Sequence, residues 1–253
     1  MCCLAKCLFG ALLGWVIFAV NLAAAGALLA GAFAPWATYS GKSLVGDVTF
    51  YVAGLGVVGS TASIPSGTTI ADLASALTAA NTATSTVPWS PSTINTVYTG
   101  MAFQCAAAAS IVAYTVFTSL FCLCMLCCVC CHSPRFNLLI AVVKAGVALV
   151  GVASMGSFFS QLDTALKALA VSPAAEAAFV AGGNIATKSA LINLAAVAGN
   201  AAGIGAGKGL GSLGVALLGL NVVLHLLLLV QCGGAHHHPP KEAPKQAGGC
   251  CRK

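Results

Sequence analysis

Cysteines are the reactive side chains that stand out in this chain of 253 residues. Twelve of the 13 cysteines fall into three groups, which precede the first long apolar segment, end the second and follow the last. Cysteines beside apolar helices are typical acceptors in S-acylation, in which a thioester links a fatty acyl chain to the thiol. Ten of them are predicted lipidation sites: Cys2, Cys3, Cys7, Cys127, Cys128, Cys130, Cys131, Cys232, Cys250 and Cys251.

Two other interpretations of the cysteines stay open. Free cysteine often packs as a small buried hydrophobe, and this is favoured for Cys122 and Cys124, which lie deeper in the second apolar segment. A metal site would combine the imidazoles of residues 236–238 with Cys232 and the C-terminal cysteines. Their spacing matches no zinc template, so the sequence predicts neither a metal site nor a cofactor.

Four long apolar segments must position these cysteines. The chain is 59% hydrophobic and only 6% charged, whereas a soluble domain carries about 25% charged residues. A membrane-spanning helix needs about 20 apolar residues. The segments that qualify are Leu8 to Phe33, Met101 to Cys131, Asn137 to Phe159 and Leu210 to Val230. The predicted fold is an all-α membrane protein, a four-helix transmembrane bundle.

The first apolar segment is predicted to stay in the protein as a span. Its apolar core is much longer than the roughly 7–15 residues of a signal peptide. Gly10 and Gly14 within it form a pair of small residues four positions apart. Such a pair allows two helices to approach closely in a membrane.

Charge predicts which side each end of the chain faces. The turn at 132–135 between the second and third segments carries one charge, Arg135, and the positive-inside rule places it in the cytosol. Four spans then put both termini in the cytosol. Seven basic residues lie on that side against Glu242, while acids and bases balance in the outer loops, so the formal net charge of +6 lies inside.

The outer loops, 34–100 and 160–209, are predicted to form a small extracellular domain of β-strands plus a helix. Val48–Val52 is rich in strand-forming residues and is flanked by glycines, which favours short antiparallel strands. Residues 66–77 have the apolar spacing of a helix, and Thr68 or Thr69 can cap it.

Two tryptophans in the first loop are candidate contacts. Trp36 directly follows the first span and is expected at the outer membrane interface. Trp89 lies between Pro88 and Pro91, and it is expected either to enter the lipid headgroups or to pack beneath the loop.

The second outer loop is predicted to be mostly helical. Its leucines near 162–169 continue the third span outward, and residues 188–200 are expected to run as a helix into the fourth span. Glycines then recur every four residues, at Gly199, Gly203, Gly207 and Gly211. On one helix they would form a smooth ridge for close helix packing; a flexible glycine-rich loop is the alternative.

Polar residues inside the spans are few. Asn221 and His225 share one face of the fourth span, and polar groups within a bilayer need partners. An interhelical hydrogen bond is expected, and a proton or ion path is the alternative. Lys144, about two turns into the third span, can extend back to the interface. Residues 1–233 form the membrane domain, and the polar residues 234–253 are expected to be a disordered cytosolic tail.

Pro35-Trp36 after the first span and Gly54-Leu55 in a strand-rich first loop resemble the claudin superfamily of four-span proteins, which includes peripheral myelin and amastin-like proteins. Gly56 stands where that family's motif has tryptophan, and the two loop cysteines of the family are missing. The resemblance implies four spans, cytosolic termini and an outer domain that contacts other membrane proteins. The candidate contact residues of this domain are Trp36, Gly54, Leu55 and Trp89.

No catalytic constellation is visible, because the few acids are widely separated and the outer loops contain no histidine. Nucleic acid binding is excluded because the basic residues are few and lie beside the membrane. The expected function is that of a claudin-like organiser, or an adhesion or scaffold component, of the plasma membrane. Its expected partners are lipids, copies of itself or other membrane proteins. A small channel or transporter that uses polar residues of the third and fourth spans is the alternative.

Overall fold

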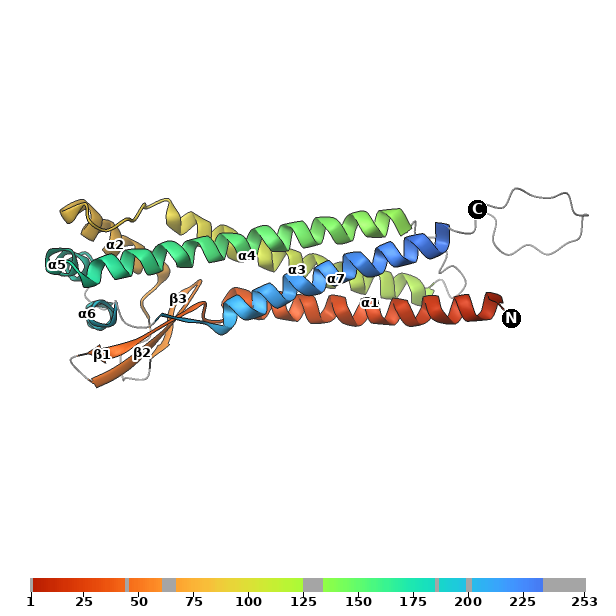
Figure 1. Cartoon of the computed structure of the whole chain (residues 1–253), viewed down its shortest axis with the longest axis horizontal. Coiled ribbons are helices and arrows are strands. Elements are labelled where there is room, and N and C mark those ends of the chain that lie inside the picture. Colours follow the sequence, from red (N-terminus) through yellow and green to blue (C-terminus); the bar gives the residue numbers. More distant parts are fainter. Residues whose placement is uncertain are drawn as a thin grey trace, which may run out of the picture.

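In a computed structural model, four long helices form a bundle, and the strands and short helices lie at one end of it (Figure 1). The structure describes residues 2–43, 46–60, 67–124, 134–184, 187–198 and 202–233. The long helices are α1 (Cys2–Phe33), α3 (Thr93–Cys124), α4 (Pro134–Ala170) and α7 (Ala206–Gly233). All four are long and apolar enough to cross a membrane, as the sequence predicted.

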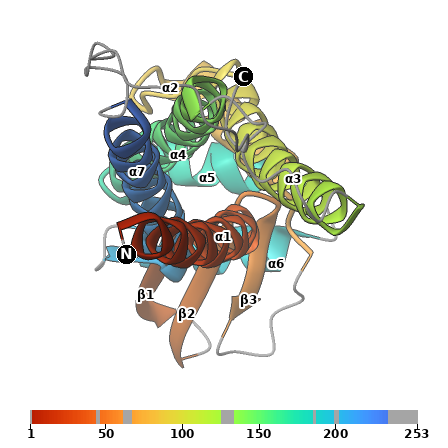
Figure 2. The same cartoon turned by 90° about the vertical axis from the view of Figure 1, so that its right-hand side faces the viewer.

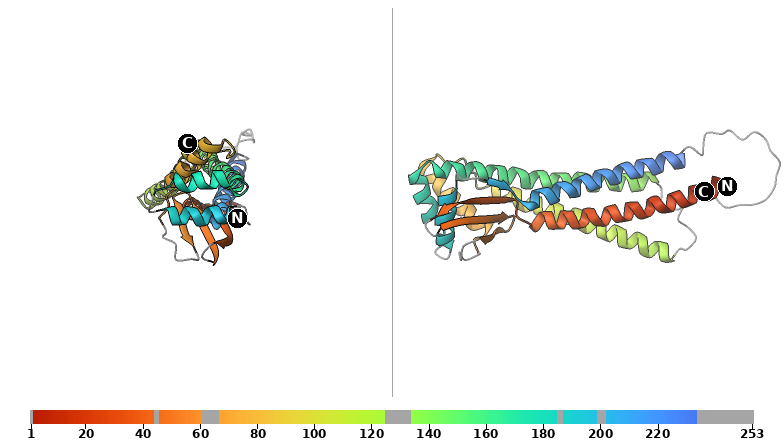
Figure 3. Two further views of the ribbon diagram at one scale, coloured as in Figure 1. Left: turned by 90° about the vertical axis from the view of Figure 1, so that its left-hand side faces the viewer. Right: turned by 60° about the horizontal axis from the view of Figure 1, so that its bottom comes forward.

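The long helices pack as a closed ring when viewed along the bundle (Figure 2). α1 packs against α7 and α3, and α4 packs against the same two helices. α1 begins and α7 ends at the same end of the bundle (Figure 1). Towards this end, α3 diverges from its neighbours (right-hand view of Figure 3). The helices therefore pack most tightly towards the opposite end, where the remaining elements lie.

The remaining elements form one globular unit at the other end, here called the head, together with the adjoining ends of α3 and α4. Its helices are α2 (Ile70–Thr84), α5 (Pro173–Ala181) and α6 (Lys188–Val197). Its strands are β1 (Ala37–Ser43), β2 (Gly46–Ala53), β3 (Gly56–Ser60) and β4 (Ala202–Ile204). The strands make an antiparallel sheet in the order β3-β2-β1-β4, so both predicted outer loops contribute to it.

Local sequence explains the first part of the head. The side chains of β2 alternate in part between buried and exposed, and Val48, Phe50 and Val52 are buried. Gly56 has φ +139°, which only glycine adopts readily, and this allows the chain to turn from β2 into β3. α2 begins with a capping box, in which Asp72 N donates to Thr69 Oγ1 at 3.1 Å and Thr69 N donates to Asp72 Oδ2 at 3.0 Å. The predicted strands and the helix cap at Thr69 are confirmed.

α4 extends well beyond the predicted end of the third span at Phe159. Its 37 residues make a helix about 55 Å long, whereas a bilayer core is about 30 Å thick. The additional turns are stable because they bury apolar side chains in the core of the head: Phe158, Phe159, Leu162, Leu166 and Leu169. The predicted outward continuation through the leucines is therefore confirmed.

The predicted helix from 188 into the fourth span is wrong. α6 ends at Val197, and β4 then pairs with β1 before α7 begins. Gly205 N donates to Trp36 O at 3.0 Å and Gly207 N to Pro35 O at 2.7 Å, so backbone pairing replaces the helical hydrogen bonds here. A Cβ on Gly207 would stand 2.6 Å from Ala34 O, which explains the requirement for glycine.

The prediction of a glycine ridge along one helix is consequently wrong as well. Gly203 lies in β4 against the side chain of Thr38, whereas Gly207 and Gly211 lie in α7 and face Trp36. Gly199 lies outside the described residues. These glycines do permit close packing, but between different elements and not along one helical face.

Candidate functional site

Trp36 is the residue on which the head and the bundle converge. It is only 3% exposed, and its ring stacks on Phe159 with 5.7 Å between centroids and 11° between planes. Its Nε1 donates to Gly31 O at the end of α1, at 2.6 Å. Trp36 therefore joins α1, α4 and α7 from inside the protein and does not present its indole to an outer partner.

Trp89 and the Gly54-Leu55 turn complete the predicted contact residues of the first loop. Trp89 is buried, with its ring edge-on to Phe158 at 6.0 Å, which agrees with packing beneath the loop. Gly54 is buried against the side chain of Met101. Leu55 is 56% exposed, so among these loop candidates it alone offers a large apolar side chain to a partner.

The bundle contains a buried polar pair that joins its first and last helices. Asn221 Nδ2 donates to Asn21 Oδ1 at 2.6 Å, across the α1–α7 interface. His225 Nδ1 lies 2.9 Å from Asn221 O, and because a carbonyl only accepts, the proton belongs on Nδ1. The expected interhelical hydrogen bond is confirmed. Sequence reasoning missed Asn21, although a lone asparagine inside an apolar helix was the available signal.

Gln104 is a second buried polar group that the sequence analysis missed. It is completely buried on α3, and within the described residues neither its Oε1 nor its Nε2 has a hydrogen-bond partner. Gly31, Gly151 and Gly211 approach it from the other three long helices. The Gln104 side chain therefore lies where all four long helices meet.

Lys144 turns into the bundle instead of reaching back to the interface. It is buried on α4, and its ammonium lies 4.2 Å from the centroid of the Tyr114 ring on α3. A cation over an aromatic face gains most where water is excluded. The Tyr114 hydroxyl also donates to Asn137 Oδ1 at 2.6 Å, so this polar contact closes the α3–α4 interface.

Gly14 of the small pair in α1 makes no close helix contact within the described residues. A Cβ on Gly14 would meet nothing within 4 Å, and the residue is exposed. Gly10 lies in α1, but nothing is described around it. Close packing of α1 occurs nearer the head instead, where Gly31 meets Gly211 and Leu28 meets Gly214.

The predicted lipidation sites divide into two sets. Cys2, Cys3 and Cys7 lie in the first turns of α1, and Cys232 lies in the last turn of α7, so four of them share the end of the bundle opposite the head. The others, together with residues 236–238, lie outside the described residues: Cys127, Cys128, Cys130, Cys131, Cys250 and Cys251.

The described residues hold no group of three or more histidine, cysteine, aspartate or glutamate side chains suited to a metal ion. Among the described residues, the polar side chains buried in the middle of the bundle include Asn21, Gln104, Lys144, Asn221 and His225, and they come from all four long helices. The Asn21–Asn221 hydrogen bond and the contact of Lys144 with the Tyr114 ring can hold neighbouring helices in register.

Asn221→Leu is expected to lower the free energy of unfolding by about 1 kcal/mol, because it leaves Asn21 Oδ1 without its donor. Asn21→Leu should cost a similar amount. The double variant should cost less than the sum of the two, since neither buried amide is left alone. Unfolding in mixed micelles measures this cycle, and strictly additive losses would contradict the coupling.

No protein-family model, curated protein or solved structure matches this chain.

Proposed function

We propose that this protein is a non-enzymatic multi-pass membrane protein that organises a membrane, as a claudin-like adhesion or scaffold component. In this proposal the head is extracellular, both termini are cytosolic and the plasma membrane is the site of action. Its partners are lipids and either copies of itself or other membrane proteins. The charge balance of the loops supports this orientation, as does the position of Cys2, Cys3, Cys7 and Cys232 at the end of the bundle opposite the head.

The observation that carries the proposal is the continuous attachment of the head to the spans. β4 precedes α7 directly and pairs with β1, which follows α1. α4 enters the core of the head without a break. A head connected in this way cannot swivel freely, so a contact on its surface would fix the orientation of the spans as well. An organiser requires that a contact on the head also orients the spans, whereas a binding module on a flexible tether does not.

Fluorescently tagged protein in adherent cells tests the proposal. It should concentrate at contacts between two expressing cells, and photobleaching should show slow recovery there. Leu55→Asp should reduce the enrichment, because it places a charge on the exposed turn beside β3. Val171→Asp is the matched control, since Val171 is an exposed apolar residue on another part of the head.

Even distribution of the wild-type protein, with fast recovery at contacts and elsewhere, would overturn the organiser function. Equal effects of Leu55→Asp and Val171→Asp would show that the β2–β3 turn has no specific part in this function.

A small channel or transporter is the second candidate, and the buried polar groups of α4 and α7 favour it. Lys144 is buried, and His225 has its Nδ1 satisfied by a carbonyl, which leaves Nε2 to exchange a proton. A pH-dependent flux in proteoliposomes that His225→Leu abolishes, with the fold intact, would establish this function. Packing alone predicts no flux.

A further inference from the structure

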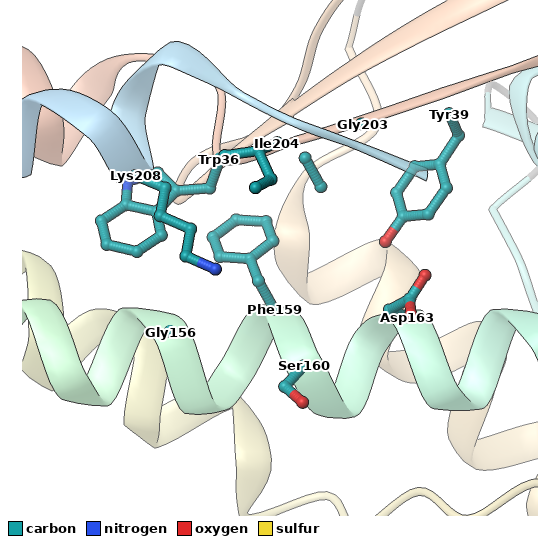
Figure 4. Close-up of a pocket in the computed structure, with 10 residues that line it drawn as sticks. Trp36, Tyr39, Gly156, Phe159, Ser160, Asp163, Gly203, Ile204 and Lys208 are labelled. Atoms are coloured by element: carbon teal, nitrogen blue, oxygen red, sulfur yellow. The ribbon is translucent and has the colours of Figure 1, made fainter. Parts of the chain in front are cut away.

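A cavity of about 250 Å³ lies where the head meets the bundle (Figure 4). It is formed by β1, β4, α4 and the first turn of α7, so segments from both predicted outer loops meet in it. Trp36 and Phe159 supply aromatic walls. The polar groups that line it include the side chains of Tyr39, Ser160, Asp163 and Lys208.

Two of these polar groups lack partners in the described part of the chain. Tyr39 is 2% exposed and its hydroxyl makes no hydrogen bond. Asp163 Oδ1 is also buried and unpaired, while Oδ2 accepts from Lys167 Nζ at 2.7 Å. The Tyr39 hydroxyl points towards the Asp163 carboxylate (Figure 4). Two buried polar atoms without partners cost stability, unless something that enters the cavity binds them.

The protonation states restrict what can enter. Burial, and secondarily the charge of Asp163, raises the pKa of Tyr39, so its hydroxyl remains a protonated donor. Asp163 Oδ1 is an acceptor. A ligand hydroxyl placed between them accepts from Tyr39 and donates to Asp163. A carboxylate oxygen there has no proton to donate to Asp163, and an ammonium has no lone pair with which to accept from Tyr39.

The size of the cavity restricts the ligand further. A protein cavity of about 150 Å³ binds benzene, which has six non-hydrogen atoms. By proportion, about 250 Å³ holds about ten, which is most of a hexose: its six-membered ring and the hydroxyl groups that face the cavity. Ser160 and Lys208, both exposed at the cavity, can donate to further hydroxyls, and the Phe159 ring offers an apolar face to the carbons of the ring.

We propose that the cavity between Tyr39, Asp163 and Lys208 binds a neutral polyol ring, such as a hexose, with one hydroxyl bridging Tyr39 and Asp163. The ring is supplied either as the headgroup of a glycolipid or as a free sugar. The site lies next to the beginning of α7 and the end of α1, where a headgroup could enter from the membrane surface.

The test uses the full chain in a detergent without a sugar headgroup, lauryldimethylamine oxide, because glucoside and maltoside detergents would compete. Thermal unfolding and tryptophan fluorescence are followed during titration with glucose, galactose and inositol. A second arm uses nanodiscs with or without a monohexosyl glycerolipid. We expect saturable stabilisation in at least one arm, and binding of the lipid alone identifies the headgroup as the source.

Tyr39→Phe is the decisive variant, because it removes only the unpaired hydroxyl and keeps the ring. It should fold at least as stably as the wild type and bind the effective probe at least about tenfold more weakly. Tyr51→Phe on β2 is the matched control and should bind normally, since Tyr51 does not line the cavity. Unchanged binding by Tyr39→Phe, or the absence of a response to every sugar and to the glycolipid, would overturn the proposal and leave the cavity to water.

Discussion

Trp36→Ala is expected to lower the free energy of unfolding by about 3–5 kcal/mol, the usual range for truncation of a buried aromatic side chain. The variant loses the stacking on Phe159 and the hydrogen bond to Gly31 O. It also leaves a cavity against the first turns of α7, where the indole now contacts Gly207 and Gly211. The head should therefore loosen from the bundle before the spans separate.

Trp15→Ala is the matched control for this prediction. The same side chain is removed, but Trp15 is 71% exposed on α1, so the expected change is within about 0.5 kcal/mol. Denaturant unfolding in mixed micelles gives both values, and limited proteolysis of the head reports whether it detaches first. Similar losses for the two variants would show that Trp36 does not join the head to the spans.

The elements that the sequence predicted correctly are those with a local signal. Long apolar segments identify spanning helices without reference to the rest of the fold, and Thr69 with Asp72 encodes its own helix cap. β2 also carries its own strand-forming residues. Each of these signals lies within a few residues of the structure it produces.

Elements that depend on distant partners could not be predicted in this way. β1 contains two serines, a glycine and a lysine in seven residues, and it forms because β2 and β4 pair with it on both sides. β4 has only three residues, too few for a pattern. Its pairing with β1 ended the helix that the alanine-rich sequence had indicated.

The residues of the candidate cavity could not be predicted from the sequence for the same reason. Tyr39 in β1 and Asp163 in α4 belong to different predicted outer loops, and nothing near either residue in the sequence indicates the other. The polar groups of the bundle were partly predictable, because each polar residue in a span needs a partner. Which residues would meet, such as Asn21 with Asn221, depends on the packing of α1 against α7.

Replacement of all ten predicted lipidation cysteines by serine is expected to abolish thioester-linked lipid and to redistribute the protein in the membrane. These are Cys2, Cys3, Cys7, Cys127, Cys128, Cys130, Cys131, Cys232, Cys250 and Cys251. Insertion should survive, because the four long helices are sufficient for anchoring. Hydroxylamine-sensitive labelling, membrane extraction and surface imaging measure the three outcomes.

The physical reason for a lateral effect is the position of the acyl chains. α1 begins and α7 ends at one end of the bundle, so chains on Cys3 and Cys232 would surround that end only. Saturated chains there change the hydrophobic length that the bilayer meets and hence the lipids that the protein prefers. Cys105→Ser on α3 is the control and should keep full labelling, since this thiol belongs to none of the three groups. A wild-type protein without any thioester-linked lipid would instead assign the cysteines to packing or to metal binding.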